Sequence, residues 1–357
     1  MLLNKVFEAT QYSLDKENKQ SVMTDLLSEL DVFHVHHSSE YKTIVESVFG
    51  GNREIKSIED LPFIPVSAFK NHQIKSISDT DVFKVLTSSG TTGQQVSRIY
   101  LDKDTAKLQT LALSKIVSHV VGQARLPMLI IDSKSIFANK SSFSARGAGI
   151  LGLSVFGKDH TYVLDDNFEP DEEVLSAFLE KYTGQPILIF GFTFMVWQYL
   201  FNAKLKNKYD LSKAILIHSG GWKKLIDIAV DNPTFRDALK QKFKLEHIYN
   251  FYGMVEQVGS IFLENSNGYL HCPNFADIII RNPVDFSVQE NGKEGLIQVI
   301  SALPKSYPGH SLLTEDIGVL MGEDDASNGW KGKYFKIIGR AKKAELRGCS
   351  DTFKSKS

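Results

Sequence analysis

The first 80 residues carry apolar side chains at helical spacing. Five of them recur so that they would share one buried helix face: Val22, Leu26, Leu27, Leu30 and Val32. Residues 61–66 then include two prolines, and each proline holds its predecessor in extended geometry. The pattern therefore predicts a helical N-terminal part over residues 1–80.

Beyond this part, apolar runs of strand length alternate with helical patterns. The predicted strands cover residues 127–132, 187–191, 214–218 and 248–252. The helical patterns cover residues 171–182, 195–204, 223–229 and 235–243. Alternation of this kind is typical of an α/β architecture with stacked, partly parallel sheets flanked by helices.

The last hundred residues are richer in predicted strands. These strands cover residues 268–272, 276–281, 295–303 and 334–338, with turn signals between them. We expect a β-rich subdomain over residues 265–340 that packs on the α/β body. The chain is thus interpreted as one domain, residues 1–340, followed by a tail, residues 341–357.

The composition is that of an ordinary globular protein and excludes several classes of function. Hydrophobic residues make up 42% of the 357 residues, charged residues make up 23%, and the formal net charge is −1. A general nucleic-acid or membrane-surface binder would carry a basic excess. No apolar run reaches the length of a membrane span, and the N-terminus lacks a signal pattern, so we expect a cytoplasmic protein.

The cysteines and clustered histidines give no metal site at this stage. Cys272 and Cys349 form no disulfide framework and have no metal-ligand spacing. His34 and His37 have helical spacing, but no acidic or sulfur partner lies near them in the sequence. We interpret the histidines as a surface cluster and Cys272 as a structural residue.

A hydroxyl-rich loop is the most informative segment of the chain. It follows the apolar segment 82–86 and consists of Thr87, Ser88, Ser89, Gly90, Thr91, Thr92 and Gly93. Such a loop can lay backbone N–H groups and hydroxyls around a polyphosphate, and its glycines permit close approach. It is not the common P-loop, because it contains no Gly-Lys-Ser/Thr ending. The alternative is a solvated turn.

Three later motifs could share a ligand with this loop. Gly220 and Gly221 follow a predicted strand and leave room for a flat ring, or form a plain tight turn. Tyr252 and Glu256 lie where another strand ends, where α/β proteins place ligands. Glu256 could hold Mg²⁺ or be an exposed helix-start residue. Asp316 could accept hydrogen bonds from ribose hydroxyls or be a turn residue.

The order of these motifs, completed by Gly339-Arg340-Ala341-Lys342, resembles the adenylate-forming superfamily of acyl-CoA synthetases, adenylation domains and luciferases. This resemblance covers roughly residues 60–350, and within the superfamily the chain looks most like the LuxE-type acyl-protein synthetases. The resemblance implies that the loop from Thr87 to Gly93 wraps the phosphates of ATP. It further implies that Gly220 and Gly221 flank adenine together with Tyr252. Glu256 would bind Mg²⁺, and Asp316 and Arg340 would bind the ribose.

The chain also departs from the superfamily patterns. Gln95-Val96 replaces the usual Pro-Lys after the phosphate loop, and Val255 replaces a threonine before the glutamate. The sequence ends 17 residues after Arg340, where typical members continue into a mobile lid domain with a catalytic lysine. We therefore expect the lid to be absent and direct ligation to CoA to be disfavoured.

Cys349 could replace the missing thiol site. In the LuxE-type enzymes an acyl group is carried on a cysteine near the C-terminus, and Arg347-Gly348-Cys349-Ser350 resembles that segment. A free thiol is only a few per cent thiolate at neutral pH, and the basic residues Lys342, Lys343 and Arg347 would favour the thiolate. The alternative is an incidental cysteine on a frayed tail.

An aromatic segment is the candidate wall for the acyl substrate. Residues 186–194 lead from a predicted buried strand into a helix, with aromatic rings around a glycine. Our acyl-pocket candidates are Gly191, Phe192, Thr193 and Trp222. Aromatic walls suit an aliphatic chain or an aryl ring. Arg146, in a polar glycine-containing segment, could meet a carboxylate or a phosphate.

The predicted function is ATP-dependent activation of a carboxylic acid, in particular a fatty acid, to acyl-AMP. Mg²⁺ would assist, and the acyl group would pass to a thiol, preferably Cys349, and on to a reductase or acyltransferase partner. One alternative is an acyl-CoA or acyl-carrier-protein ligase that serves cell-surface polysaccharide acylation. Another is a non-catalytic nucleotide-binding subunit of a reductase complex.

Overall fold

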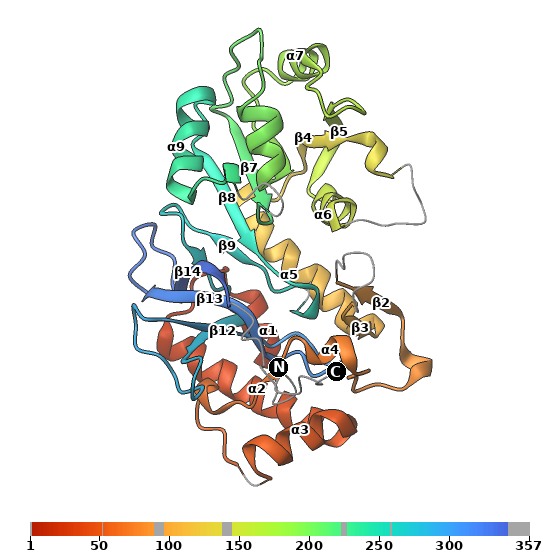
Figure 1. Cartoon of the computed structure of the whole chain (residues 1–357), viewed down its shortest axis with the longest axis vertical. Helices are drawn as coiled ribbons and strands as arrows, with labels where there is room; N and C mark the ends of the chain where they lie inside the picture. The colour runs from red at the N-terminus through yellow and green to blue at the C-terminus, as the bar shows by residue number, and fades with distance from the viewer. Residues whose placement is uncertain are drawn as a thin grey trace, which may run out of the picture.

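The computed structural model describes residues 2–51, 53–88, 96–137, 145–222, 227–257 and 259–341 (Figure 1). Its N-terminal part is helical, as predicted, with α1 (Leu2–Glu8), α2 (Lys16–His37), α3 (Ser39–Phe49) and α4 (Ala68–Asn71). The Asp15 side chain accepts a hydrogen bond from the Asn18 N–H and so caps α2. One detail of the pattern is wrong, because Val32 is 55% exposed.

The parallel half of the structure contains five strands. They are β4 (Leu126–Ser133), β5 (Gly157–Leu164), β6 (Ile187–Phe192), β7 (Ala214–Ser219) and β8 (His247–Tyr252). They pair in the order β8-β7-β6-β4-β5. The four predicted strands of this region are confirmed, whereas β5 is an additional edge strand whose middle residues are exposed or half-buried.

Helices cover the parallel half. They are α5 (Lys103–Val121), α6 (Ala145–Ser154), α7 (Glu172–Lys181), α8 (Thr193–Val196) with the turn η4 (Trp197–Phe201), and α9 (Asn232–Phe243). Successive residues of β4 enter two different cores: Met128 and Ile130 pack with α5, whereas Leu129 and Ile131 pack with α7 and α9. Such strands, buried on both faces, read as continuous apolar runs.

The antiparallel half continues the same sheet. Its strands are β9 (Phe262–Glu264), β10 (Leu270–His271), β11 (Ala276–Arg281), β12 (Glu294–Ser301), β13 (Ser311–Glu323) and β14 (Lys333–Arg340). They follow the order β11-β12-β13-β14-β10-β9 and join the parallel half where β9 pairs with β8. The short β1 (Ile64–Pro65) pairs with β13. Figure 1 shows this half in blue over the red N-terminal helices.

The chain topology predicts where a ligand would bind. The connection after β4 leads outward to β5, whereas the connections after β6 lead in the opposite direction to β7 and β8. In open α/β sheets, ligands occupy the crevice at the carboxyl ends of the strands where this direction changes. Here that point lies between Ser133, the end of β4, and Phe192, the end of β6.

Two other sequence interpretations can be compared with the structure. Cys272 is structural as expected, since it is 1% exposed. His34, interpreted as part of a surface cluster, is instead fully buried between the Ser76 hydroxyl, 2.8 Å from Nδ1, and the Pro304 carbonyl, 3.1 Å from Nε2. In the described part of the chain, no helix is long and apolar enough to cross a membrane.

Candidate functional site

Tyr252, Asp316 and Arg340 meet where the parallel and antiparallel halves join. Tyr252 ends β8, and its hydroxyl donates a hydrogen bond to Asp316 Oδ2 at 2.6 Å. Asp316 and Arg340 are partners in the β13–β14 ladder, with Arg340 Nε 3.4 Å from Asp316 Oδ1. The structure therefore brings together three of the residues that the sequence assigned to a nucleotide.

The three side chains differ in exposure and charge. Burial, together with the Asp316 carboxylate, raises the pKa of Tyr252 well above its ordinary value, so the hydroxyl stays protonated and donates. The Asp316 side chain is 19% exposed, while that of Arg340 is 75% exposed. Asp316 is not a turn residue, because it lies inside the 13-residue strand β13. It thus presents a largely buried carboxylate beside an exposed cation.

Glu256 lies a few residues after Tyr252 in the turn η6 (Val255–Gln257). The residue is only 8% exposed, and within the described residues its carboxylate has no hydrogen bond or ion pair. The neighbouring Gln257 anchors this turn by donating from Nε2 to the Gly309 carbonyl at 3.1 Å. Glu256 thus carries a carboxylate without a partner in the described part of the chain, in a turn that Gln257 anchors.

A hairpin places the first two residues of the hydroxyl-rich loop, Thr87 and Ser88, in the part of the fold that contacts that turn. It consists of β2 (Lys84–Thr87) and β3 (Arg98–Leu101), and β3 contacts η6. Thr87 ends β2 and is exposed. Ser88 exchanges two hydrogen bonds with Ser97, one through its backbone N–H and one through its hydroxyl. The other loop candidates lie outside the described residues: Ser89, Gly90, Thr91, Thr92 and Gly93. Cys349 also lies outside them.

Gly220 lies against a flat ring that belongs to the protein itself. Its φ is +86°, and a Cβ added there would come within 2.8 Å of Phe192 Cδ1. This contact follows from the register of β6 and β7, which pairs Phe192 with Ser219. Gly221 is exposed, and a Cβ on it would meet nothing within 4 Å. Open backbone is therefore found at Gly221 and not at Gly220.

The remaining acyl-pocket candidates are mostly packed inward. A Cβ on Gly191 would come within 2.8 Å of Ile131 Cβ, so this glycine admits a tight strand contact. Thr193 is 7% exposed, and its hydroxyl lies 2.9 Å from His218 Nδ1. Trp222 packs edge-on against Trp197, with ring centroids 6.1 Å apart. Phe192 is half-buried and remains the candidate that reaches the open strand ends.

Comparison with known proteins identifies the family. A model of the acyl-protein synthetase family LuxE matches residues 2–357. This chain belongs to that family. The chain is also 22% identical to the long-chain-fatty-acid–luciferin-component ligase of Aliivibrio fischeri, over 94% of this chain and 88% of that protein. Its identity to the Vibrio harveyi protein of the same name is 21%, over 97% and 90%.

Solved structures show the same fold. An open conformation of 2-hydroxyisobutyryl-CoA ligase, in complex with its acyl adenylate and CoA, superposes with a TM-score of 0.66 at 15% identity, covering 92% of this chain and 76% of that one. The α/β class predicted from the sequence, an adenylate-forming N-terminal domain, is thus confirmed. Membership of the LuxE family also confirms the predicted enzyme class, an AMP-forming acid–thiol ligase that activates acids as acyl adenylates.

An ion pair at the end of β4 belongs to the same edge of this acyl-protein synthetase. Arg146, on the first turn of α6, places Nε 3.0 Å from Asp132 Oδ2 and Nη2 3.3 Å from Oδ1. Burial raises the pKa of Asp132, and Arg146 opposes that rise. The sequence singled out Arg146 but missed Asp132, although an acidic residue at the end of a buried apolar run was a usable signal. Because Asp132 neutralises Arg146, this cation is an anchor for α6 and not a free anion receptor.

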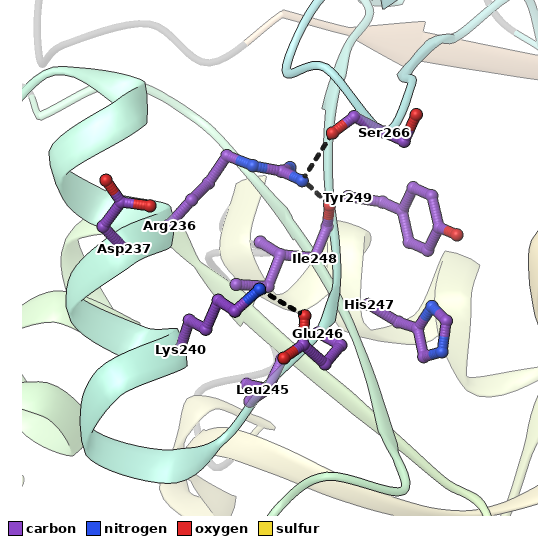
Figure 2. A pocket seen from close by; sticks show the side chains of 9 residues that line it. All are labelled: Arg236, Asp237, Lys240, Leu245, Glu246, His247, Ile248, Tyr249 and Ser266. Atoms are coloured by element: carbon purple, nitrogen blue, oxygen red, sulfur yellow. Dashed lines mark hydrogen bonds and ion pairs between the residues drawn. The ribbon is translucent and has the colours of Figure 1, made fainter. Parts of the chain in front are cut away.

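A pocket of about 380 Å³ opens at the opposite edge of the sheet, near the start of β8 (Figure 2). Figure 2 shows Arg236 and Lys240 of α9 pointing toward β8 and the segment around Ser266. Arg236 donates to the Ile248 carbonyl and pairs with Glu264, and Lys240 pairs with Glu246 at 2.7 Å. The two cations of the pocket, Arg236 and Lys240, are thus paired with carboxylates, and the pocket lies away from the strand ends that carry Tyr252.

Proposed function

We propose that this LuxE-family enzyme uses ATP to activate a fatty acid and then carries the acyl group on Cys349. In the first step, a carboxylate oxygen attacks the α-phosphorus of ATP, which gives acyl-AMP and pyrophosphate. In the second step, the Cys349 thiolate attacks the acyl carbon, which gives a thioester and AMP. The observation that carries the proposal is the junction of Tyr252, Asp316 and Arg340 beside the turn of Glu256.

The ribose of ATP fits the Asp316 carboxylate. An ionised carboxylate has about four acceptor positions, and Tyr252 and Arg340 engage one at each oxygen of Asp316. The remaining positions can accept from two neighbouring ribose hydroxyls. Because the Tyr252 hydroxyl stays protonated, it holds the carboxylate in one orientation. Arg340, which is exposed, can close over the sugar or the α-phosphate.

The phosphates and Mg²⁺ fit the neighbouring turn and hairpin. Mg²⁺ prefers oxygen ligands and is commonly bound by one or two carboxylates together with substrate phosphates. Glu256 offers such a carboxylate, largely buried and without a partner among the described residues. No group of three or more metal-ligating side chains is found within the described ranges, so the substrate would supply the other ligands. Bound Mg²⁺ would neutralise phosphate charge, and hydroxyls from Thr87 onward would orient the triphosphate.

The acyl substrate and its acceptor are inferred from the comparisons and the sequence. The two named relatives are ligases for long-chain fatty acids, which supports a fatty acid here. The family description, acyl-protein synthetase, supports a protein thiol as acceptor. Cys272 is unsuited to that role, because it is buried and its pKa is raised far above the ordinary value. Cys349 is then the acceptor we propose, with delivery to a reductase or acyltransferase.

The adenylation step is tested by acid-dependent exchange of pyrophosphate into ATP. We expect exchange with one or more acids of a series from acetate to palmitate, supplemented with benzoates. Glu256→Gln should lower the rate at least about 100-fold, whereas Glu290→Gln, at an exposed position, should leave it unchanged. Absence of exchange with every acid would contradict the proposal and favour a nucleotide-binding subunit.

The transfer step is tested by intact-protein mass spectrometry after incubation with ATP, Mg²⁺ and the preferred acid. We expect a mass increase equal to the acid less one water, which hydroxylamine removes. Cys349→Ser should abolish this increase but retain pyrophosphate exchange. If Cys349→Ser still turns over normally and releases a free acyl thioester in the presence of CoA or a carrier protein, self-acylation is wrong and direct ligation is correct.

A further inference from the structure

The Phe192 ring is held between two glycines that come from different elements. On one side, a Cβ added at Gly220 would come within 2.8 Å of Cδ1 and 3.3 Å of Cε1. On the other side, a Cβ added at Gly149 of α6 would come within 3.2 Å of Cζ and 3.3 Å of Cε2. A methyl group at Gly220 would collide with the ring, whereas one at Gly149 would press against it and require it to shift by a few tenths of an ångström. The ring therefore fills the whole distance between α6 and the loop after β7.

This ring lies at the boundary between the core and the open end of the sheet. Phe190, two residues earlier on β6, is fully buried, and its ring meets that of Phe192 edge-on at 6.1 Å. Phe192 itself is half-buried, and Gly220 beside it is exposed. The position is the end of β6, where the direction of the strand connections changes. An aromatic ring there is a wall that a bound acid can touch.

The element on the Gly149 side of the ring is firmly placed. Arg146, one turn before Gly149, is paired with Asp132 at the end of β4. Ile150 and Leu153 of the same helix are buried, with 1% and 3% exposure. Because α6 is anchored by both the ion pair and these side chains, a methyl group on Gly149 must displace the ring and cannot easily displace the helix.

We propose that Phe192 selects the acid by size and that Gly149 sets the position of its ring. The inference rests on the proposed function. The ring separates α6, at Gly149, from the loop after β7, at Gly220, and the apolar part of a carboxylic acid packs on the part of the half-buried ring that these two elements leave uncovered. Removal of the ring enlarges this site and admits longer acids. A methyl group on Gly149 pushes the ring toward the acid and favours shorter acids.

The test measures kcat/KM for pyrophosphate exchange with saturated acids from acetate to palmitate. Phe192→Ala and the milder Phe192→Leu should raise the ratio of the longest to the shortest accepted acid by at least about tenfold, the discrimination that one methylene gives in a pocket. Gly149→Ala should lower the same ratio. Gly152→Ala is the matched control on α6, because its Cβ would meet no atom of the described residues within 4 Å, and its profile should equal that of the wild type.

Two outcomes would overturn this inference, and they differ from failure of the proposed function. Phe192→Leu and Gly149→Ala could lower kcat/KM for all acids by one common factor, or could shift the ratio in the same direction. With thermal unfolding showing folded variants, the first result means that the ring supports the fold without selecting the acid. The second means that Gly149 does not act by setting the position of the ring. If the wild type exchanges pyrophosphate with none of the acids, both the proposed function and this inference are wrong.

Discussion

The Tyr252 hydroxyl donates a hydrogen bond to Asp316 Oδ2 at 2.6 Å, across 64 positions of the sequence. The bond joins the last residue of the parallel half to the middle of β13. One side chain comes from the motif that the sequence assigned to adenine, and the other from the motif assigned to ribose. A single contact thus links two candidate subsites and fixes their relative position.

Tyr252→Phe removes this bond and leaves the aromatic ring in place. We expect KM for ATP to rise about three- to tenfold with a smaller change in kcat, because Asp316 loses the group that orients it. The free energy of unfolding should fall by about 1.5–3 kcal/mol, the usual contribution of a hydrogen bond to a charged group. Exchange kinetics and urea unfolding measure the two effects. Tyr269→Phe, at a half-buried tyrosine outside the site, serves as the control. An unchanged KM for ATP would separate Tyr252 from nucleotide binding.

Substitution by alanine should affect the stability of the protein at one glycine of the candidate site and not at another. At Gly191 a Cβ would collide with Ile131 and Val196, so Gly191→Ala should lower the free energy of unfolding by about 1–3 kcal/mol through overpacking. At Gly221 a Cβ meets no atom of the described residues within 4 Å, so Gly221→Ala should leave stability unchanged.

The second substitution tests the proposed adenine contact at Gly221. If adenine lies on this backbone, Gly221→Ala should raise KM for ATP several-fold while the thermal midpoint stays at its wild-type value. Differential scanning fluorimetry and exchange kinetics distinguish the two glycines. A Gly221→Ala enzyme with wild-type KM for ATP would remove Gly221 from the site.

Breaking the ion pair between Arg146 and Asp132 should destabilise the protein, because it leaves a buried charge without its partner. Arg146→Met leaves the 2%-exposed Asp132 side chain without its cation, and we expect a loss of about 3 kcal/mol. The double variant with Asp132→Asn should recover part of that loss. The exposed pair of Lys107 and Asp104 is the comparison, since Lys107→Met should change stability by less than about 0.5 kcal/mol. Equal losses at the two pairs, measured by urea unfolding at pH 7, would show that burial of Asp132 does not matter.

The parts of the fold that the sequence predicted are those with local signals. β4, β6 and β7 are largely buried on both faces, so they appear as apolar runs between helical patterns. β8 is mostly half-buried, and its apolar and aromatic residues mark it as a strand. β13 was missed as a strand because Thr314, Glu315 and Asp316 interrupt its apolar residues at the point where it carries the candidate site. These polar residues do not look like part of a strand in the sequence, but hydrogen bonding to β14 holds them in strand conformation.

The contacts that sequence reasoning could not supply depend on register and on distant partners. Gly-Gly after β7 indicated room for a ring, but only the pairing of Phe192 with Ser219 shows which ring occupies it. His34 is at an unremarkable helix position, and it is buried because Ser76 and Pro304 arrive from elsewhere in the chain. Neither the strand register nor the long-range packing produces a periodic pattern of apolar and polar residues in the sequence.

Buried neutral histidines should make the protein sensitive to mild acid. His218 is fully enclosed, and burial lowers its pKa to about 3; the nearby cation Arg236 acts in the same direction. An unfolded histidine has a pKa near 6.5. Between these values the unfolded state binds a proton that the folded state does not. The contribution of His218 to stability is therefore present above pH 6.5 and is lost as the pH falls toward 3.

His218→Gln tests this sign directly. The wild type should lose stability between pH 6 and pH 4, and the variant should lose about 1.4 kcal/mol less per pH unit, because one proton no longer distinguishes the two states. Urea unfolding at half-unit pH intervals measures both slopes. His36→Gln, at an exposed ring, should keep the wild-type slope. If His218→Gln keeps it as well, His218 accepts its proton in the folded state, and the enclosure of this ring between Thr193 and Phe235 must open at moderate pH.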